Sequence, residues 1–301
     1  MLNVCKTLLV LLCLAVCEGR RKDGIYIVGG YNTVNGSAEP LGTITIFDPI
    51  AGTTEVSPIR LTRGRMDHTA GRYGDQLIVT GGRSLCPSCR SGMTKPEFSE
   101  IIDLKNGSVT RAPNTNTLRW KSISAVHDGK FFVCGMFDNG SPRSYPEMSC
   151  EAYNFATNQW EEVPTMPGDS DLRILASVGN DLILLSTEDR HAWKLANNGS
   201  GLQWSALNDV PWAFRDTAAA VYKGRLHLCG GWMHPANETS FGVSNKCFRH
   251  DPETDTWDGL FGSSRDGAVQ KYDESVGEWK MLPGTTFGDS DNQFYAMVSV
   301  D

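Results

Sequence analysis

The feature that most constrains the fold of this chain is an internal repeat with a period of about 50 residues. Five copies contain a short apolar run of β-forming residues, which in most of them ends in glycine, as expected for a strand followed by a tight turn. These runs lie at residues 25–30, 77–82, 131–136, 182–187 and 226–231. Such a period predicts supersecondary units that stack on one another, because one unit cannot bury both of its faces.

A second pattern follows each glycine run after a variable stretch. An aromatic or apolar residue, six residues with turn chemistry and often a tryptophan predict two strands joined by a tight connection. The pairs are Tyr153 and Trp160, His250 and Trp257, Tyr272 and Trp279, Phe47 and Thr54, Ile102 and Val109, and Trp193 and Trp204, the last with four extra residues between them. The chain therefore contains six copies of the repeat.

The double glycine and the Tyr-x6-Trp spacing resemble the kelch family over essentially the whole mature chain. This resemblance implies an all-β fold, a six-repeat kelch β-propeller whose blades have four strands, a to d, counted outward from a central channel. Sheets stacked radially bury one another, so we expect the tryptophans to lie between blades. The predicted repeats are 24–59, 60–112, 113–166, 167–210, 211–258 and 259–301.

The strand count refines this prediction. Strand a is expected from residues 68, 123, 174 and 217, and once more at 295–300, whereas the first repeat begins directly at strand b. We therefore expect the last strand to complete the first blade and close the ring. The sixth blade is expected to be truncated, with strands a and b missing, because Trp257 and Trp279 are only 22 residues apart. A tolerated deletion, a splice variant and an imperfect gene model remain open explanations.

The N-terminal residues predict secretion. A basic start, an apolar run of ten residues and small residues before a cut after Cys17 are typical of a signal peptide at residues 1–17, which leaves residues 18–301 as one domain. Five N-glycosylation sequons agree with this route: Asn35, Asn106, Asn139, Asn198 and Asn237. The net charge of -7 disfavours nucleic acid and anionic membranes as partners, and no later segment is long enough for a membrane span.

Six cysteines remain in the mature chain, an even number that suits an oxidising compartment. Cys134 and Cys150 hold the same places in the third repeat as Cys229 and Cys247 in the fifth, on strands b and c. Since these strands are neighbours, we predict the disulfides Cys134 to Cys150 and Cys229 to Cys247. For Cys86 and Cys89 we favour a local disulfide over a redox motif or half of a zinc site.

Long b-to-c loops gather at one end of the predicted propeller, where the resemblance implies peptide binding. An arginine introduces strand a in four repeats, and such guanidinium groups would recognise a carboxylate, sulfate or phosphate. The alternative is that they pair internally with Asp67, Asp216, Asp169 or Asp171. The candidate binding residues are Arg65, Arg119, Arg173, Arg215, Trp232 and His234.

We expect no enzyme activity, no cofactor and no metal site. The six histidines are scattered without chelating spacing, and the acidic runs at 168–171 and 288–292 supply too few oxygens for a calcium loop. The favoured function is a secreted interaction protein that recognises an extracellular protein or an anionic peptide or glycan. A carbohydrate-active propeller, as a lectin or a sugar oxidase or mutarotase, and a structural component of the extracellular matrix are the alternatives.

The signal peptide and the sequons give a direct prediction. Expression of the full chain in a eukaryotic secretory cell line should release a protein into the medium whose first residue is Glu18, and N-glycosidase treatment should lower its mass. N-terminal sequencing and electrophoresis measure both. A product that keeps residues 1–17 and stays inside the cells would contradict the secretory assignment.

Overall fold

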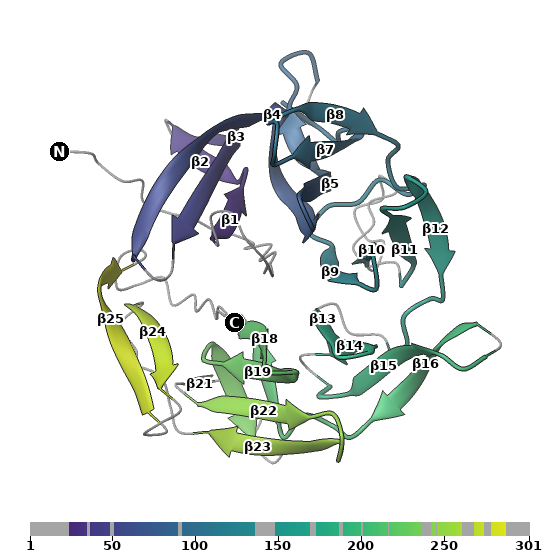
Figure 1. Ribbon diagram of the computed structural model, residues 1–301, viewed down its shortest axis with the longest axis vertical. Helices are drawn as coiled ribbons and strands as arrows, with labels where there is room; N and C mark the ends of the chain where they lie inside the picture. Colours follow the sequence, from purple (N-terminus) through teal and green to yellow (C-terminus); the bar gives the residue numbers. More distant parts are fainter. Residues whose placement is uncertain are drawn as a thin grey trace. The chain divides into compact units, whose positions relative to one another are not determined.

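A computed structural model describes residues 24–34, 37–48, 51–89, 92–135, 148–168, 173–186, 189–199, 201–215, 217–235, 242–244, 246–260, 268–273 and 278–286. Within these ranges every regular element is a β-strand (Figure 1). None of the described segments forms a helix with the length and hydropathy of a membrane span. The chain divides into two compact units, Met1–Pro167 and Gly168–Asp301, and each is described by itself.

In the first unit, the first two repeats share one eight-stranded antiparallel sheet. Its strands are β1 (Ile25–Val28), β2 (Tyr31–Val34), β3 (Ser37–Asp48), β4 (Thr53–Tyr73), β5 (Gln76–Leu85), β6 (Met93–Thr94), β7 (Ser99–Asp103) and β8 (Val109–Ala112). The order is β1-β3-β4-β5-β7-β8, with β2 on β3 and β6 on β5. The long strand β4 joins the repeats, because its start pairs with β3 and its end, from Met66, pairs with β5.

The third repeat completes the first unit as a four-stranded antiparallel sheet in the order β12-β11-β10-β9. Its strands are β9 (Ile123–His127), β10 (Lys130–Cys134), β11 (Cys150–Asn154) and β12 (Gln159–Val163). They follow one another as the predicted strands a to d, and the a-to-b turn needs only Asp128 and Gly129.

The second unit contains two further four-stranded sheets and two smaller ones. The fourth repeat forms β13 (Arg173–Val178), β14 (Asp181–Ser186), β15 (Ala192–Asn197) and β16 (Leu202–Leu207). The fifth forms β18 (Ala218–Tyr222), β19 (Arg225–Cys229), β22 (Cys247–Asp251) and β23 (Thr256–Leu260), together with a separate ribbon of β17 (Trp212–Arg215), β20 (Trp232–Pro235) and β21 (Gly242–Val243). Repeats two to five thus show the four-stranded meander that the sequence predicts.

The described part of the sixth repeat is a two-stranded sheet of β24 (Ala268–Asp273) and β25 (Glu278–Thr286). In it Tyr272 lies opposite Trp279, as in strands c and d of the other repeats. The strand predicted at 295–300 lies outside the described residues, so the closure of the ring by this strand stays a prediction.

The spacing of six residues sets the register of strands c and d. The paired positions Tyr153 and Trp160 lie directly opposite each other, as do those of the first, second, fifth and sixth repeats. The fourth repeat differs from the prediction, because Trp204 faces Leu195 and not Trp193. The extra residues there extend both strands instead of enlarging the turn, and Leu195 takes the aromatic position.

The core lies between consecutive repeats within each unit. One cluster of buried apolar residues joins the first and second repeats around Ile44 and Leu77, and another joins the second and third around Ile78 and Phe131. A third cluster joins the fourth and fifth repeats. Trp160 and Trp257 pack against two of these clusters, which agrees with their predicted place between blades. Consecutive repeats within each unit therefore bury apolar faces against one another in these three clusters.

Three disulfides tie strand ends and one loop. Cys134 pairs with Cys150 across β10 and β11, and Cys229 pairs with Cys247 across β19 and β22, with Cα atoms 4.2 and 4.1 Å apart. Cys86 pairs with Cys89 in the loop after β5. The two strand-linking disulfides are thus paired as the repeat topology predicts, and Cys86 and Cys89 form the local disulfide that the sequence favours.

The two strand-linking disulfides should stabilise the fold more than the loop disulfide does. They close segments with sequence separations of 16 and 18 residues, compared with 3 for Cys86 and Cys89. Loop-closure entropy then predicts a loss of about 3 kcal/mol for Cys134→Ala/Cys150→Ala and about half of that for Cys86→Ala/Cys89→Ala. Denaturant unfolding of both double variants measures the difference, and non-reducing peptide maps that link different repeats would overturn the pairing.

Candidate functional site

Arg65 lies at the start of the second repeat and is fully buried. Its guanidinium pairs with Glu100 at 3.1 Å, and the side chains of both residues are 0% exposed. Further donors reach the carbonyl oxygens of Gly81 and Phe98, at 3.1 and 2.7 Å. Burial lowers the pKa of Arg65, while the carboxylate of Glu100 opposes that shift. This arginine stabilises its own sheet and is not exposed for a ligand.

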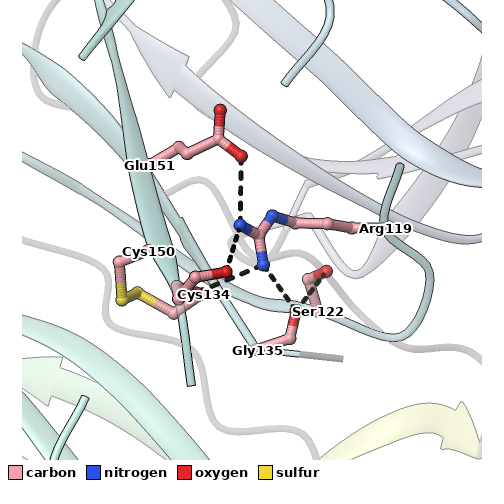
Figure 2. The surroundings of a disulfide bond; sticks show 7 residues. Arg119, Ser122, Cys134, Gly135, Cys150 and Glu151 are labelled. Carbon is pink, nitrogen blue, oxygen red and sulfur yellow. Dashed lines mark hydrogen bonds and ion pairs between the residues drawn. A yellow bond between two sulfur atoms is a disulfide. The ribbon is translucent and has the colours of Figure 1, made fainter. Parts of the chain in front are cut away.

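Arg119 repeats this arrangement in the third repeat (Figure 2). Its guanidinium pairs with Glu151 at 3.0 Å and donates to the carbonyl of Gly135 at 3.1 Å, beside the disulfide of Cys134 and Cys150. The hydroxyl of Ser149 accepts another hydrogen bond from it, at 2.8 Å. The expectation of solvent-facing guanidinium groups at Arg65 and Arg119 is therefore wrong, because a buried glutamate on strand c holds each one.

The double glycine of one repeat contacts the arginine of the next. Gly30 donates its backbone N–H to the carbonyl of Arg65, and Gly82 donates to the carbonyl of Arg119, both at 2.8 Å. A Cβ atom on Gly81 would stand 2.5 Å from the Arg119 carbonyl, and its φ of +68° also favours glycine. The glycines are thus needed for the close approach of consecutive sheets.

The acidic partners differ from those that the sequence suggests. Asp67 lies beside Arg65 in the chain but pairs with Arg83, whose guanidinium also stacks over Trp120 at 4.8 Å from the ring centroid. Asp169, Asp171 and Asp216 lie outside the described residues. A glutamate two positions before the aromatic position of strand c, which is present in repeats two and three, is the sequence signal that identifies the true partner.

The other two arginines do not share the register of Arg65 and Arg119. Arg65 stands four residues before Thr69, which pairs with Thr80, the last residue of strand b before Gly81. Likewise, Arg119 stands four residues before Ile123, which pairs with Cys134, the last residue before Gly135. In the fifth repeat Ala218 pairs with Cys229, so Phe214 takes the arginine position and Arg215 follows it.

Arg173 differs in another way. It is the first residue of β13 and pairs with Ser186. In the fourth repeat this position lies three residues after the one that corresponds to Arg119. Its side chain lies outside the described atoms. The four arginines predicted as one set therefore occupy three different positions.

Ordered ribbons extend three repeats beyond their double glycines. We call loop ribbons the pair of β2 and β3, the end of β5 with β6, and β20 with β17 and β21. Trp232 on β20 is 43% exposed and faces Arg215, which is exposed as well. His234, on the same strand, is half-buried opposite Ala213. The structure thus brings together three of the predicted binding residues: Arg215, Trp232 and His234.

The other end of the second and third repeats is hollowed between short turns. A cavity of about 490 Å³ there is lined by residues that include Tyr73, Asp75, Asp128, Lys130 and Phe155. The rings of Tyr73 and Phe155 stack at 5.2 Å. Sequence reasoning missed this cavity, because short turns carried no signal of a binding site.

In the part of the chain that the structure describes, no group of three His, Cys, Asp or Glu side chains is placed to hold a metal ion. Asn106 and Asn198 are exposed, whereas the sequons at Asn35, Asn139 and Asn237 lie outside the described residues.

The comparisons with known proteins agree with this geometry. Residues 124–167 match the Kelch motif. The chain is 26% identical over 205 residues to Kelch-like protein 40 of Xenopus tropicalis, which covers 66% of this chain and 30% of that protein. It is 26% identical over 182 residues to Kelch-like protein terF of Aspergillus terreus (strain NIH 2624 / FGSC A1156), covering 56% of this chain and 39% of that protein.

The chain thus spans between 30% and 39% of the length of these two relatives. Among solved structures, that of YjhT aligns with a TM-score of 0.62 and 14% identity, over 90% of this chain and 91% of YjhT. At this identity the match shows the fold alone. The chain carries a Kelch motif, is distantly similar to Kelch-like proteins and shares its fold with YjhT.

His68 lies beside the glycines of two repeats and gives a pH prediction. A Cβ on Gly29 or Gly82 would stand 2.7 Å from its side chain, and burial, then the charge of Arg65, lowers its pKa from 6.5 to about 4. The unfolded chain binds the additional proton between these values, so stability should fall as the pH drops from 6.5 to 4, by about 3 kcal/mol in full.

The variant His68→Gln should remove this part of the pH dependence, because glutamine does not titrate. Urea unfolding at several pH values between 7 and 4 measures it. His191→Gln is the matched control, since His191 is 53% exposed. Equal slopes in the wild type and in His68→Gln would contradict the assignment.

Proposed function

We propose that this chain is a secreted six-repeat kelch β-propeller that binds an extracellular partner through its loop ribbons and catalyses nothing. The ring is closed by residues 295–300, which complete the first blade, and the sixth blade lacks strands a and b. The Kelch motif, the four-stranded sheets and the fold shared with YjhT support this architecture. The predicted signal peptide, the sequons and the paired cysteines support secretion.

One observation carries the binding role. The large hydrophobic residues exposed in the described part of the chain include one on each loop ribbon: Val34 at 42%, Leu85 at 47% and Trp232 at 43%. Exposed apolar side chains on ordered backbone suit protein contacts, because their burial in a complex costs little conformational entropy. Each of the three stands within five residues of a double glycine, and the sheet below fixes the backbone there.

The scaffold below the ribbons is cross-linked by side-chain interactions. Buried ion pairs hold the second and third repeats, and disulfides hold strands b and c of the third and fifth repeats. Arg215 beside Trp232 supports a partner with negative charge. A lectin or sugar-converting propeller and a matrix component are the other candidate functions, and the same experiment separates the lectin and the enzyme from the proposed role.

The test compares two triple variants of the secreted protein that remove equal numbers of exposed apolar side chains. The ribbon variant is Val34→Ser/Leu85→Ser/Trp232→Ser, and the control is Val56→Ser/Tyr73→Ser/Leu202→Ser, whose wild-type residues are 57%, 50% and 37% exposed. Biotinylated wild type is first screened against arrays of extracellular proteins, random peptides and glycans. Binding to the selected protein or peptide should weaken by about tenfold or more in the ribbon variant alone.

Two results would overturn the proposal. Loss of binding in the control variant would move the site to the short-turn end, where Tyr73 lines the cavity. A glycan ligand without any protein or peptide ligand would favour the lectin, and turnover of that glycan would favour the enzyme.

A further inference from the structure

The cavity at the short-turn end of the second and third repeats lies entirely within the first unit. Its volume is about 490 Å³, which suits a small organic molecule. The turns after β4, β7, β9 and β11 supply its walls, because the a-to-b and c-to-d turns of an antiparallel meander lie at the same end of the sheet. Two repeats thus build one concave site.

Tyr73, at the end of β4, gives the cavity an aromatic wall. One face of its ring stacks on Phe155, with the centroids 5.2 Å apart and the planes inclined by 26°. Phe155 is itself buried and packs edge-on against the buried ring of Tyr153. Tyr73 nevertheless remains 50% exposed. A ring that is held in this way is preorganised for a ligand, because it loses little conformational freedom on binding.

The positive charges around the cavity are already engaged within the chain. The ammonium of Lys105 lies 2.6 Å from Asp75, and that of Lys130 lies 2.6 Å from Glu161. Arg72, next to the aromatic wall in the chain, is buried and stacks over a tyrosine of the first repeat. These cations therefore oppose a further positive charge only weakly.

Two carboxylates of the cavity keep their negative charge. Asp103 accepts hydrogen bonds from the backbone N–H groups of Lys105 and Asn106, which are neutral donors. Asp128 is exposed in the a-to-b turn of the third repeat. Among the residues that the structure describes, neither carboxylate forms an ion pair. The cavity thus combines an aromatic ring with negative charge, and both attract an organic cation.

The fifth repeat shows the equivalent tyrosine with a cation in place. Tyr222 and Tyr73 correspond to each other, because each pairs across the a-to-b turn of its repeat with the first residue of strand b. The next residue in the fifth repeat is Lys223, whose ammonium lies 5.2 Å from the centroid of the Tyr222 ring. In the second repeat the next residue is Gly74, and none of the described cations lies over the ring of Tyr73.

We infer that the cavity binds a small organic cation, whose ammonium or guanidinium group lies between the ring of Tyr73 and the carboxylate of Asp128. The two groups are neighbours, because a Cβ atom on Gly129 would stand 3.5 Å from the Tyr73 hydroxyl. The ring attracts the cation through its quadrupole, and the carboxylate attracts it by charge.

The ligand is expected to be small. The exposed sequon at Asn106 adjoins the c-to-d turn of the cavity, and a glycan there would hinder a protein partner more than a small molecule. This site is separate from the loop ribbons, so the inference goes beyond the proposed function and does not depend on it.

The experiment titrates the secreted wild-type protein with three cations, each with a neutral counterpart of similar shape. The pairs are butylammonium and butan-1-ol, butylguanidinium and butylurea, and choline and 3,3-dimethylbutan-1-ol. Ligand-observed NMR measures the affinities. At least one cation should bind with a dissociation constant on the order of 1 mM, and its counterpart should bind about tenfold more weakly.

Substitutions in the two contacting groups locate the site. Tyr73→Leu should weaken binding about fivefold or more, because it removes the ring, whereas Tyr73→Phe should stay within about twofold of the wild type. Asp128→Asn should weaken binding about threefold or more. An Asn-Gly pair suits this two-residue turn, in which Asp128 and Gly129 have φ values of 46° and 67°. Glu253→Gln, which removes an exposed carboxylate from the second unit, is the matched control and should leave the affinity within about twofold.

Gly74→Lys tests the comparison with the fifth repeat directly. Gly74 has a φ of 58°, close to the 47° of Lys223, and a Cβ atom on it would meet nothing within 4 Å. The new ammonium should lie over Tyr73 and weaken binding of the added cation about fivefold or more. Gly74→Gln makes the same backbone change without the charge, so it should bind within about twofold of the wild type. Thermal melts of all variants check the fold.

The outcomes that would overturn the inference are distinct. They are no binding of any cation at about 10 mM, equal binding of the neutral counterparts or of galactose, and unchanged affinity in both Tyr73→Leu and Asp128→Asn. The variant Val34→Ser/Leu85→Ser/Trp232→Ser should bind the cations like the wild type. Loss of cation binding at this cavity therefore leaves the proposed function standing, and failure of the ribbon experiment leaves this inference standing.

Discussion

The described part of the first unit depends on two buried arginines, Arg65 and Arg119, each of which links two consecutive repeats. The carbonyl of Arg65 or Arg119 accepts a hydrogen bond from the double glycine of the preceding repeat, while the guanidinium pairs with a glutamate of its own repeat. Removing such a charge from water is costly, and only a partner with further hydrogen bonds offsets that cost. The glycines, the arginine and the glutamate therefore act as one unit, and the loss of one member leaves the others buried without compensation.

The fifth repeat shows that this unit can be replaced as a whole. Phe214 and Phe248 fill the space of the ion pair. The hydroxyl of Thr217 donates a hydrogen bond to the carbonyl of Gly230, just as the hydroxyl of Ser122 donates to the carbonyl of Gly135 in the third repeat. The backbone geometry of strands a, b and c stays the same, since the disulfides and the pairing are equivalent. Core chemistry can thus change between repeats without a change of the sheet that supports the ribbons.

The strands, their order within repeats two to five and the disulfide pairing could be predicted from the sequence, because glycine runs, alternation and a spacing of six residues are local signals with a fixed geometric meaning. The role of the arginines could not be obtained in this way. Arg119 and Arg215 precede the a-to-b turns of their repeats by nearly the same number of residues. A difference of one residue in register nevertheless places Arg119 in the core and Arg215 at the surface. The glutamates at 100 and 151 were the sequence signal for the buried ion pairs. The loop ribbons could not be predicted, because they depend on pairings between residues of irregular loops.

A repeated scaffold separates two kinds of positions, and this separation explains where recognition can develop. Positions below the double glycines are buried, so a change at one of them must be matched by a change elsewhere in the same core cluster, as Phe214 is matched by Phe248. The residue that follows the second glycine varies more, and it is tyrosine, arginine or tryptophan in repeats one, two and five. In the second repeat the arginine at this position is held by Asp67 and Trp120, whereas the fifth repeat exposes its tryptophan opposite Arg215. Equivalent sites on one scaffold therefore differ in what their side chains do: Arg83 forms an ion pair within the chain, whereas Trp232 is 43% exposed.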